Sequence, residues 1–507
     1  MRLTLAFLLA FVAGSGWTFA WAQDGTTRTD PLTASVISAA LAFISPRALD
    51  PVSIQQLALW GLDAPASLDG ALRTELRDNT VLLLHNGRVV FQRVIPAEDT
   101  PAGWGDLVAD LLRAAAAASP AVDRAGHQGA ITAFFDELFN HLDPYSRYVA
   151  PAAASLDRAR RSGEAGAGLQ VKRLGASTVI TDVNADGPAA EAGIHVGDRL
   201  LAVDDQPTQG EDLATVQNWI GGIEGTDVSL TIRDRRGRTR TVELERAVIP
   251  PETVFASRVG EALLIRIASF SADTDERLSR ELTRALAAPT ARTVRGIILD
   301  LRGNRGGLLK QAVEATDLLL DAGVIAVTAG RNPQAIHEWR ATHGDVAMGR
   351  PVVVLVDGRS ASAAEIMAAA LADQGRAVVV GSATLGKGLV QTIATLPDGG
   401  ELFVSWSRVL APSGWPLQSL GLLPQVCTSL GQDTANAQLA ALDRGVQPMA
   451  LALARHRAAR APLPAAEALA LRNPCPAAEA READVATARF LITHPTAYNT
   501  ARLAPPN

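Results

Sequence analysis

The 507-residue chain is poor in several features that mark specialised classes of protein. Only two cysteines occur, which excludes a small scaffold held together by many disulfides. No long basic run appears and the net charge is -6, which argues against nucleic acid as a partner. No repeat at a fixed period is present, so solenoids and propellers are set aside. The chain is 48% hydrophobic and long enough for roughly two to four domains with substantial cores.

Histidine is also scarce, with eight residues in the whole chain. His337 and His343 lie in HEWRATH, which is neither H-E-x-x-H nor another spacing typical of metal ligands. We therefore interpret both as surface residues. No metal or cofactor is implied by the sequence.

The N-terminus has the pattern of a secretory signal peptide over residues 1–22. Arg2 precedes an apolar run, and Ala20-Trp21-Ala22 provides a small-x-small cleavage site. The alternative is an uncleaved membrane anchor, because residues 3–22 carry no charge, although Gly14-Ser15-Gly16 interrupts them. We expect an exported protein that is periplasmic or extracellular, with no later segment able to span a bilayer.

The two cysteines, Cys427 and Cys475, lie near the C-terminus in loop-like sequence. In an oxidising compartment such a pair is expected to form a disulfide that closes a C-terminal loop. Two unpaired buried thiols remain the alternative, because the sequence does not show how close the Cα atoms come.

The pattern of apolar residues divides the chain into regions of different character. Residues 30–150 are mainly helical, with one hairpin predicted around Asn86-Gly87. Glycines gather at residues 162–166, and short strands follow to about Val248. From Glu261 onward apolar strands alternate with helices, which predicts an α/β core with a largely parallel sheet.

The segment Gly381–Gly388, GSATLGKG, imitates a phosphate-binding P-loop. Gly388 stands where that motif needs Ser or Thr for Mg²⁺, and the sequence that follows is typical of a strand. No helix N-terminus would then hold phosphate, so we reject nucleotide binding.

A serine, Ser362, lies at a predicted turn from strand to helix, a geometry that exposes a nucleophile. The alternative is a capping box formed by Ser362 and Glu365. Lys387 follows 25 residues later, at the same end of the neighbouring α/β unit. A lysine acts as general base if burial lowers its pKa, and Leu385, Leu389 and Val390 provide apolar surroundings.

The stretch GRSASAAEIMAAALADQGRAVVVGSATLGKGLVQ resembles the catalytic stretch of the carboxyl-terminal processing proteases, the serine peptidases of the S41 type. The resemblance implies Ser362 as nucleophile, Lys387 as general base and Gln391 as the side chain that orients the lysine. Asp373 and Glu365 match positions of structural support. The resemblance covers about residues 135–426.

Two further stretches agree with this family. LDLRGNRGGLL resembles the loop whose glycine contributes to the oxyanion hole, which implies Gly306 and Ala363 as the two N–H donors. A plain turn after a strand is the alternative for Gly306-Gly307. LDPYSRYVAP also fits the family. The departures are Ala364 for a second serine, Arg305 in the glycine loop and Leu385 for a frequent Phe, and none removes a catalytic group.

The stretch GPAAEAGIHVGDRLLAVDDQP, residues 187–207, resembles a PDZ domain. The resemblance places Gly166, Ala167, Gly168 and Leu169 in the loop that binds a peptide's terminal carboxylate. A PDZ domain that only braces the core is the alternative.

The fold class predicted from this resemblance is α/β, with a ClpP/crotonase-like catalytic core, an inserted PDZ domain and helical segments at both termini. The expected divisions are residues 1–22, 23–160, 161–250 for the PDZ domain, 251–428 for the peptidase core and 429–507. The expected function is serine endopeptidase action on exported proteins, with protein or peptide substrates bound through their C-termini. A homo-oligomer or an adaptor is an open alternative for further partners. The rival function is a peptide-binding adaptor with an inert hydrolase fold.

Overall fold

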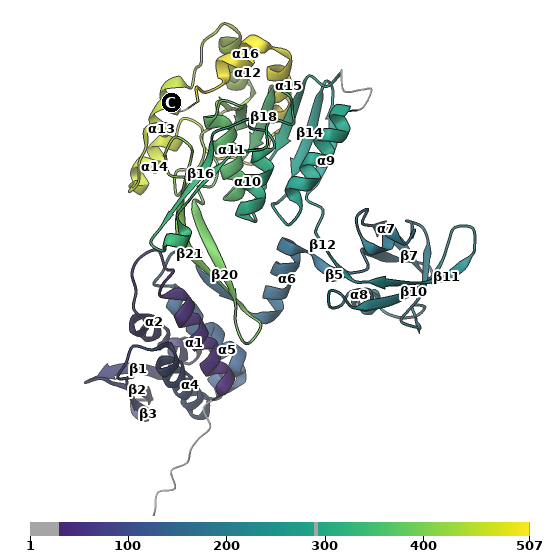
Figure 1. Cartoon of the computed structure of the whole chain (residues 1–507). Helices are drawn as coiled ribbons and strands as arrows, with labels where there is room; N and C mark the ends of the chain where they lie inside the picture. Colours follow the sequence, from purple (N-terminus) through teal and green to yellow (C-terminus); the bar gives the residue numbers. More distant parts are fainter. Residues whose placement is uncertain (1–29, 288–292, 506–507) are drawn as a thin grey trace, which may run out of the picture.

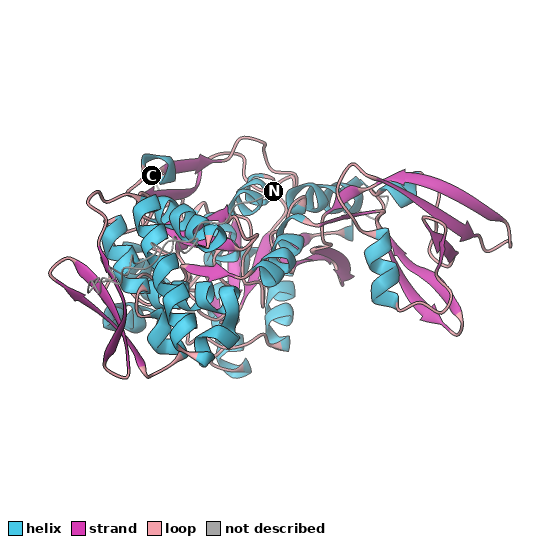
Figure 2. Cartoon of the chain, turned by 90° about the horizontal axis from the view of Figure 1, so that it is seen from below, coloured by secondary structure: helices cyan, strands magenta, loops and turns pink. Residues whose placement is uncertain are grey.

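The structure is a computed structural model, and it describes residues 30–287 and 293–505. The predicted signal peptide, residues 1–22, lies outside the described residues. Figure 1 shows three parts: a core at the top, the N-terminal region below it, and a strand-rich lobe that extends to one side. Figure 2, turned by 90°, shows the same lobe at one end of the molecule.

The N-terminal region packs helices against a small antiparallel sheet. Its helices are α1 (Pro31–Ile44), α2 (Ile54–Gly61), α3 (Ala64–Leu68), α4 (Pro101–Ala118) and α5 (Pro120–Phe139). Its sheet has the order β1 (Leu72–Arg77), β2 (Thr80–His85) and β3 (Arg88–Val94). The predicted hairpin is confirmed as β2–β3, with positive φ at Asn86 and Gly87 as a type I′ turn requires. The preceding strand β1 was not predicted, because its Asp78-Asn79 turn lacks glycine and both residues adopt positive φ.

A short connecting segment leads from this region into the strand-rich lobe. Strand β4 (Arg147–Val149) and helix α6 (Pro151–Ser162) are followed by β5 (Glu164–Gly166), which pairs with the returning strand β12 (Ala247–Ile249). Between them lies a sheet of order β11-β10-β8-β7-β6, with β9 paired to β8. Its strands and helices are β6 (Leu169–Leu174), β7 (Ser177–Val183), α7 (Pro188–Glu191), β8 (Arg199–Val203), β9 (Gln206–Pro207), α8 (Leu213–Ile220), β10 (Asp227–Arg233) and β11 (Thr239–Glu245).

The core is built on a mostly parallel sheet of order β13-β14-β15-β18-β19-β22. Only the edge strand β13 runs antiparallel. The strands are β13 (Val254–Val259), β14 (Ala262–Ile267), β15 (Gly296–Asp300), β18 (Val352–Val356), β19 (Ala377–Gly381) and β22 (Val426–Cys427). The predicted parallel α/β core is therefore confirmed, and the unbroken apolar runs reflect strands buried on both faces.

Helices cover both faces of this sheet. On one face pack α9 (Thr274–Ala287), α10 (Leu309–Asp317) and α11 (Ala363–Asp373), in one apolar cluster with Val352 and Val354. On the other face pack α12 (Gln432–Asp443), α15 (Glu482–Thr493) and α16 (Pro495–Ala501), in a cluster with Val353 and Leu355. Alternate residues of β18 thus face opposite layers, as the period of a strand dictates.

A second, antiparallel sheet joins the core to the N-terminal region. Its order is β17-β16-β21-β20, with β4 paired to β21. Its strands are β16 (Val324–Gly330), β17 (His337–Arg340), β20 (Leu389–Thr395) and β21 (Glu401–Leu410). Figure 1 shows β20 and β21 reaching from the core down to the N-terminal helices. Because β20 follows Gly388 directly, no helix begins where a P-loop would need one.

The remaining elements are the short helix η2 (Pro333–Ala335) and the C-terminal helices α13 (Ala450–Ala458) and α14 (Ala465–Arg472). Across residues 30–287 and 293–505, none of the helices has the length and apolar character needed to cross a membrane.

Candidate active site

Ser362 lies at the turn between β18 and α11, in the segment that we call the nucleophile loop, residues 357–362. Its φ of 56° lies in the left-handed region, which a residue with a side chain adopts only where the surroundings enforce it. Asp357 provides part of that support, because its Oδ1 accepts the backbone N–H of Gly303 at 2.9 Å and of Ser360 at 3.0 Å. The strained turn leaves the Ser362 side chain half-buried at the end of a rigid strand.

Glu365 joins this turn to the segment that carries the lysine, which we call the lysine loop, residues 382–388. Its fully buried carboxylate accepts the backbone N–H of Ser362 at 2.8 Å. The same carboxylate accepts the N–H of Gly386 at 2.7 Å and of Lys387 at 2.9 Å, and it also accepts the Thr384 hydroxyl. Burial raises the pKa of Glu365, and these hydrogen bonds oppose the rise. Glu365 therefore does more than close a capping box, since it holds both loops on one side chain.

The amine of Lys387 is largely withdrawn from water. Its Nζ lies 3.4 Å from Gln391 Oε1 and 5.0 Å from the centre of the Tyr145 ring. Burial lowers the pKa of Lys387, and the positive charge of Arg147 lowers it further, while Asp143 and Glu365 act in the opposite direction. This environment favours the neutral amine that a general base requires.

Gln391 is placed to orient that amine. Its Nε2 donates to the Tyr145 carbonyl at 2.5 Å, which leaves Oε1 directed toward Lys387 Nζ. The residue lies on β20, at a shift in the register between β20 and β21.

The glycine loop after β15 approaches Ser362 closely. A Cβ atom on Gly306 would lie 2.8 Å from the Ser362 Cβ and 3.1 Å from the Ala363 backbone nitrogen, so only glycine fits there. The Gly306 N–H donates to Oδ1 of the buried Asn304 at 2.8 Å. Within the described parts of the chain, the N–H groups of Ala363 and Gly307 donate no hydrogen bond.

Asp373 lies at the far end of α11 from Ser362 and does not join the site. Its buried carboxylate accepts the Ser413 N–H at 3.1 Å and the Trp415 indole N–H at 3.0 Å, and it pairs with Arg457 at 2.9 Å. These contacts fix the C-terminal end of the helix whose N-terminal end presents the serine.

Several residues at the site were not singled out from the sequence. Tyr145 and Arg147 lie in the LDPYSRYVAP stretch, whose position beside the lysine is fixed by tertiary contacts: the pairing of β4 with β21 and the hydrogen bond from Gln391 to the Tyr145 carbonyl. Asn304 and Thr384 lie in the LDLRGNRGGLL and GSATLGKG stretches, but the sequence did not assign their contacts: Asn304 accepts the Gly306 N–H, and the Thr384 hydroxyl donates to Glu365.

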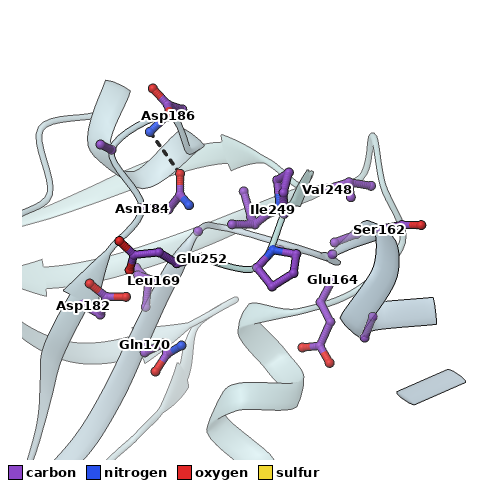
Figure 3. Close-up of a pocket in the computed structure, with 18 of the residues that line it drawn as sticks. Ser162, Glu164, Leu169, Gln170, Asp182, Asn184, Asp186, Val248, Ile249 and Glu252 are labelled. Carbon is purple, nitrogen blue, oxygen red and sulfur yellow. Dashed lines mark hydrogen bonds between the residues drawn. The ribbon is translucent and has the colours of Figure 1, made fainter. Parts of the chain in front are cut away.

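The four residues predicted to bind a carboxylate lie in the side lobe and line a cavity of about 1830 Å³ (Figure 3). Gly166 ends β5 and Leu169 begins β6, so the open loop is shorter than predicted and consists of Ala167 and Gly168. The N–H groups of these two residues make no hydrogen bond within the described residues. Leu169 and Ile220 are buried beside them. The residues around this cavity include neither Ser362 nor Lys387, so it is separate from the serine–lysine site.

Cys427 and Cys475 form a disulfide, with their Cα atoms 5.7 Å apart. It connects β22, at the edge of the core sheet, to the loop after α14.

Comparisons with known proteins identify two known domain families in this chain. The model of "Peptidase family S41" matches residues 261–428, and that of "PDZ domain" matches residues 179–234. The chain is 34% identical over 327 residues to a carboxyl-terminal-processing protease of Picosynechococcus, covering 61% of this chain and 77% of the relative. It is 33% identical over 288 residues to a carboxy-terminal-processing protease of Bartonella bacilliformis, covering 56% of this chain and 66% of the relative.

A solved structure titled photosystem II D1 C-terminal processing protease is 25% identical, with a TM-score of 0.36, and the match covers 75% of this chain and 98% of that one. The predicted fold class is confirmed as a mixed α/β structure with a PDZ domain and helices at both ends. A core of the ClpP/crotonase kind is consistent with the S41 match.

Proposed function

We propose, from the premise that this chain belongs to the carboxyl-terminal processing proteases of peptidase family S41, that it cleaves proteins with a Ser362–Lys387 dyad. Members of this family are serine-type peptidases, and the chain carries a PDZ domain. The observation that carries the proposal is Glu365, whose carboxylate accepts the backbone N–H of both the serine and the lysine.

The chemistry requires a neutral lysine. Lys387 Nζ takes the proton of the Ser362 hydroxyl as Oγ attacks the carbonyl carbon of the scissile peptide bond. The same amine then gives that proton to the leaving nitrogen, and an acyl-enzyme ester remains. Water, deprotonated by Lys387, hydrolyses the ester and releases the second product. Gln391 keeps the amine oriented through these steps.

The developing oxyanion needs donors beside Ser362. The N–H of Ala363 is free to serve, because it belongs to the first residue of α11. Gly306 is the second proposed donor, and it serves when its N–H turns from Asn304 toward the substrate. The Gly306 backbone lies close enough to Ser362 for this role, since a Cβ atom on Gly306 would lie 2.8 Å from the Ser362 Cβ.

The PDZ domain is proposed to bind the C-terminus of the substrate. The free N–H groups of Ala167 and Gly168 suit a terminal carboxylate, and the adjacent Leu169 and Ile220 suit an apolar last side chain. The alternative, a PDZ domain that braces the core, predicts no preference between free and blocked substrate tails.

The proposal also covers the domain boundaries and the cellular location of the protein. We assign residues 161–250 to the PDZ domain and 251–428 to the peptidase core, with a helical region on each side. The pattern of residues 1–22 supports export, so we propose exported proteins as substrates.

The test is whether the protein cleaves an unstructured substrate such as casein. The rival hypothesis, a peptide-binding adaptor with an inert hydrolase fold, predicts no cleavage. We expect the wild-type protein to cleave it and the Ser362→Ala and Lys387→Ala variants to leave it intact while keeping their circular dichroism. Ser257→Ala, at an exposed serine on β13, is the matched control and should retain activity. Wild-type turnover by Ser362→Ala would show that another group is the nucleophile.

A further inference from the structure

The C-terminal segment 472–478 touches both loops of the proposed active site. The carbonyl oxygen of Ala478 accepts the N–H of Gly358, in the nucleophile loop, at 2.7 Å. The carbonyl oxygen of Cys475 accepts the N–H of Ala383, in the lysine loop, at 3.3 Å. This segment lies outside residues 261–428, which the S41 family model matches.

Arg472 makes the most extensive contact between this segment and the lysine loop. Its Nη2 donates to the Thr384 carbonyl at 2.6 Å, and its Nη1 donates to the carbonyls of Leu385 and Ser419, each at 3.1 Å. Within the described residues it forms no ion pair. A guanidinium whose Nη1 and Nη2 both donate to carbonyl oxygens fixes backbone geometry, because its N–H groups form a rigid planar fork.

The contact reaches the residue next to the lysine. A Cβ atom on Gly386 would lie 3.0 Å from Arg472 Nη1, so the guanidinium packs directly against the backbone before Lys387. On the other side of the same backbone, the N–H groups of Gly386 and Lys387 bind Glu365. The lysine loop is therefore held between an arginine that binds its carbonyls and a glutamate that binds its N–H groups.

The disulfide anchors this arginine to the core. Arg472 is the last residue of α14, and its carbonyl accepts the N–H of Cys475 at 3.1 Å. Cys475 is bonded to Cys427, which belongs to the central sheet. The covalent link therefore fixes the end of α14 at the lysine loop.

We propose that Arg472 is a positioning residue for Lys387, held on the lysine loop by the Cys427–Cys475 disulfide. The inference rests on the proposed function, in which Lys387 is the base. With Arg472 in place, the lysine loop keeps the Lys387 amine withdrawn from water. A loosened loop would let water stabilise the ammonium form and would move Nζ away from the position in which it accepts the Ser362 proton.

The test measures kcat and KM for a peptide substrate from pH 5 to 10 in the full-length enzyme. For Arg472→Ala we expect kcat to fall by about tenfold to a hundredfold, with KM little changed. The midpoint at which kcat rises should move to higher pH. Arg472→Lys keeps the charge without the fork, so it should resemble Arg472→Ala. Arg460→Ala is the matched control, because Arg460 also binds carbonyls in this region but none in the lysine loop.

The pH midpoint separates positioning from mere stability. If a variant folds poorly, its kcat is reduced by the same factor at every pH, because a fixed fraction of the enzyme is inactive. The pH midpoint of the kcat profile then stays where it is in the wild type. An unchanged midpoint for Arg472→Ala, or full recovery by Arg472→Lys, would overturn the inference. If the wild-type profile shows no ionisation that depends on Lys387, the proposed function itself fails.

The role of the disulfide is tested by combining variants. Cys427→Ser with Cys475→Ser should move the midpoint in the same direction as Arg472→Ala. Adding Arg472→Ala to that pair should cause no further shift, because the two changes act through one contact. Additive shifts of the pH midpoint would contradict the proposal that the disulfide acts by holding Arg472 on the lysine loop.

Discussion

At the scale of single residues, the site depends on a lysine whose charge is disfavoured by its surroundings. The largest cause is burial, and the second is the positive charge of Arg147 on strand β4, which pairs with β21. Both lower the pKa of Lys387. In the proposed mechanism the base is the neutral amine, so activity should be absent at low pH and rise once as pH passes the lowered pKa.

The contribution of Arg147 gives a direct prediction. Arg147→Gln removes the positive charge, so the pKa of Lys387 should rise and the increase of kcat with pH should begin at higher pH. The measurement is the pH dependence of kcat, with the exposed Arg160→Gln as control. A midpoint at the same pH in Arg147→Gln, or one that depends on a histidine, would contradict this electrostatic account.

The limits of sequence reasoning are clearest at single residues. Ser362, Lys387 and Gln391 are proposed as site residues because their types and spacing match a family motif, and the structure joins the serine and lysine loops through Glu365. Tyr145 could not be predicted as the neighbour of Lys387, because tertiary contacts, the pairing of β4 with β21 and the hydrogen bond from Gln391, bring it there. The hydrogen bond from the Gly306 N–H to Asn304 is likewise a property of backbone geometry.

At the scale of elements, helix α6 is the piece that connects the side lobe to the core. Arg161, near its C-terminal end, pairs with the buried Glu401 at 2.7 Å, and its carbonyl accepts the N–H of Ala272 at 2.8 Å. Arg158 binds the same glutamate at 3.1 Å. The helix is thereby attached to the first residue of β21.

This attachment predicts unequal effects of two arginines on one helix. Arg161→Ala should lower the free energy of unfolding of the core by about 1.5 to 3 kcal/mol, because Glu401 loses a charged hydrogen-bond partner. Arg160→Ala, whose side chain is 76% exposed, should change it by less than about 1 kcal/mol. Urea unfolding followed by tryptophan fluorescence measures the difference. Equal effects would mean that the pair with Glu401 does not stabilise the fold.

The secondary structure of the core was predictable for a physical reason. Runs such as PVVVLV are apolar without alternation, which is typical of a strand covered on both faces, and both faces of β18 are covered. Strand β1 has a mixed burial pattern, with one buried residue, Leu72, so its sequence carries no comparable signal. The contacts of segment 472–478 with the nucleophile loop and the lysine loop are tertiary contacts that no local pattern encodes.

At the scale of the whole molecule, the proposed peptide-binding loop and the serine–lysine site lie in different parts of the chain. The loop of Ala167 and Gly168 lies between β5 and β6 of the side lobe, and Ser362 lies between β18 and α11 of the core. Figure 1 shows these elements in separate parts of the molecule. A substrate bound at both places would have its last residue in the lobe and an upstream bond in the core.

This arrangement predicts a preference for free C-termini. Amidating the C-terminus of a peptide substrate removes the charge that the loop holds, and charged hydrogen bonds are worth roughly 1.5 to 3 kcal/mol, so kcat/KM should fall by about ten- to a hundredfold. Gly168→Ala should reduce the difference between the two peptides, because Gly168 has a φ of 77° and tight backbone neighbours. Gly175→Ala, at a turn glycine with φ of 60° and open space, is the control. Equal cleavage of free and amidated peptides by the intact enzyme would favour a bracing role.

The central claim is that Ser362 forms a covalent bond to the substrate with Lys387 as its base. A p-nitrophenyl ester of a short peptide, added at a pH above the midpoint of the kcat profile and quenched with acid during the first turnover, should leave the enzyme acylated, because the activated leaving group makes acylation faster than hydrolysis. Ser362 Oγ forms the new ester bond as p-nitrophenolate leaves. Trypsin digestion would yield residues 360–376 in one peptide, and its fragmentation distinguishes Ser360 from Ser362. The account predicts the acyl mass on Ser362 in the wild type and its absence in Ser362→Ala. An adduct on another residue, or continued turnover of the ester by Ser362→Ala, would contradict it.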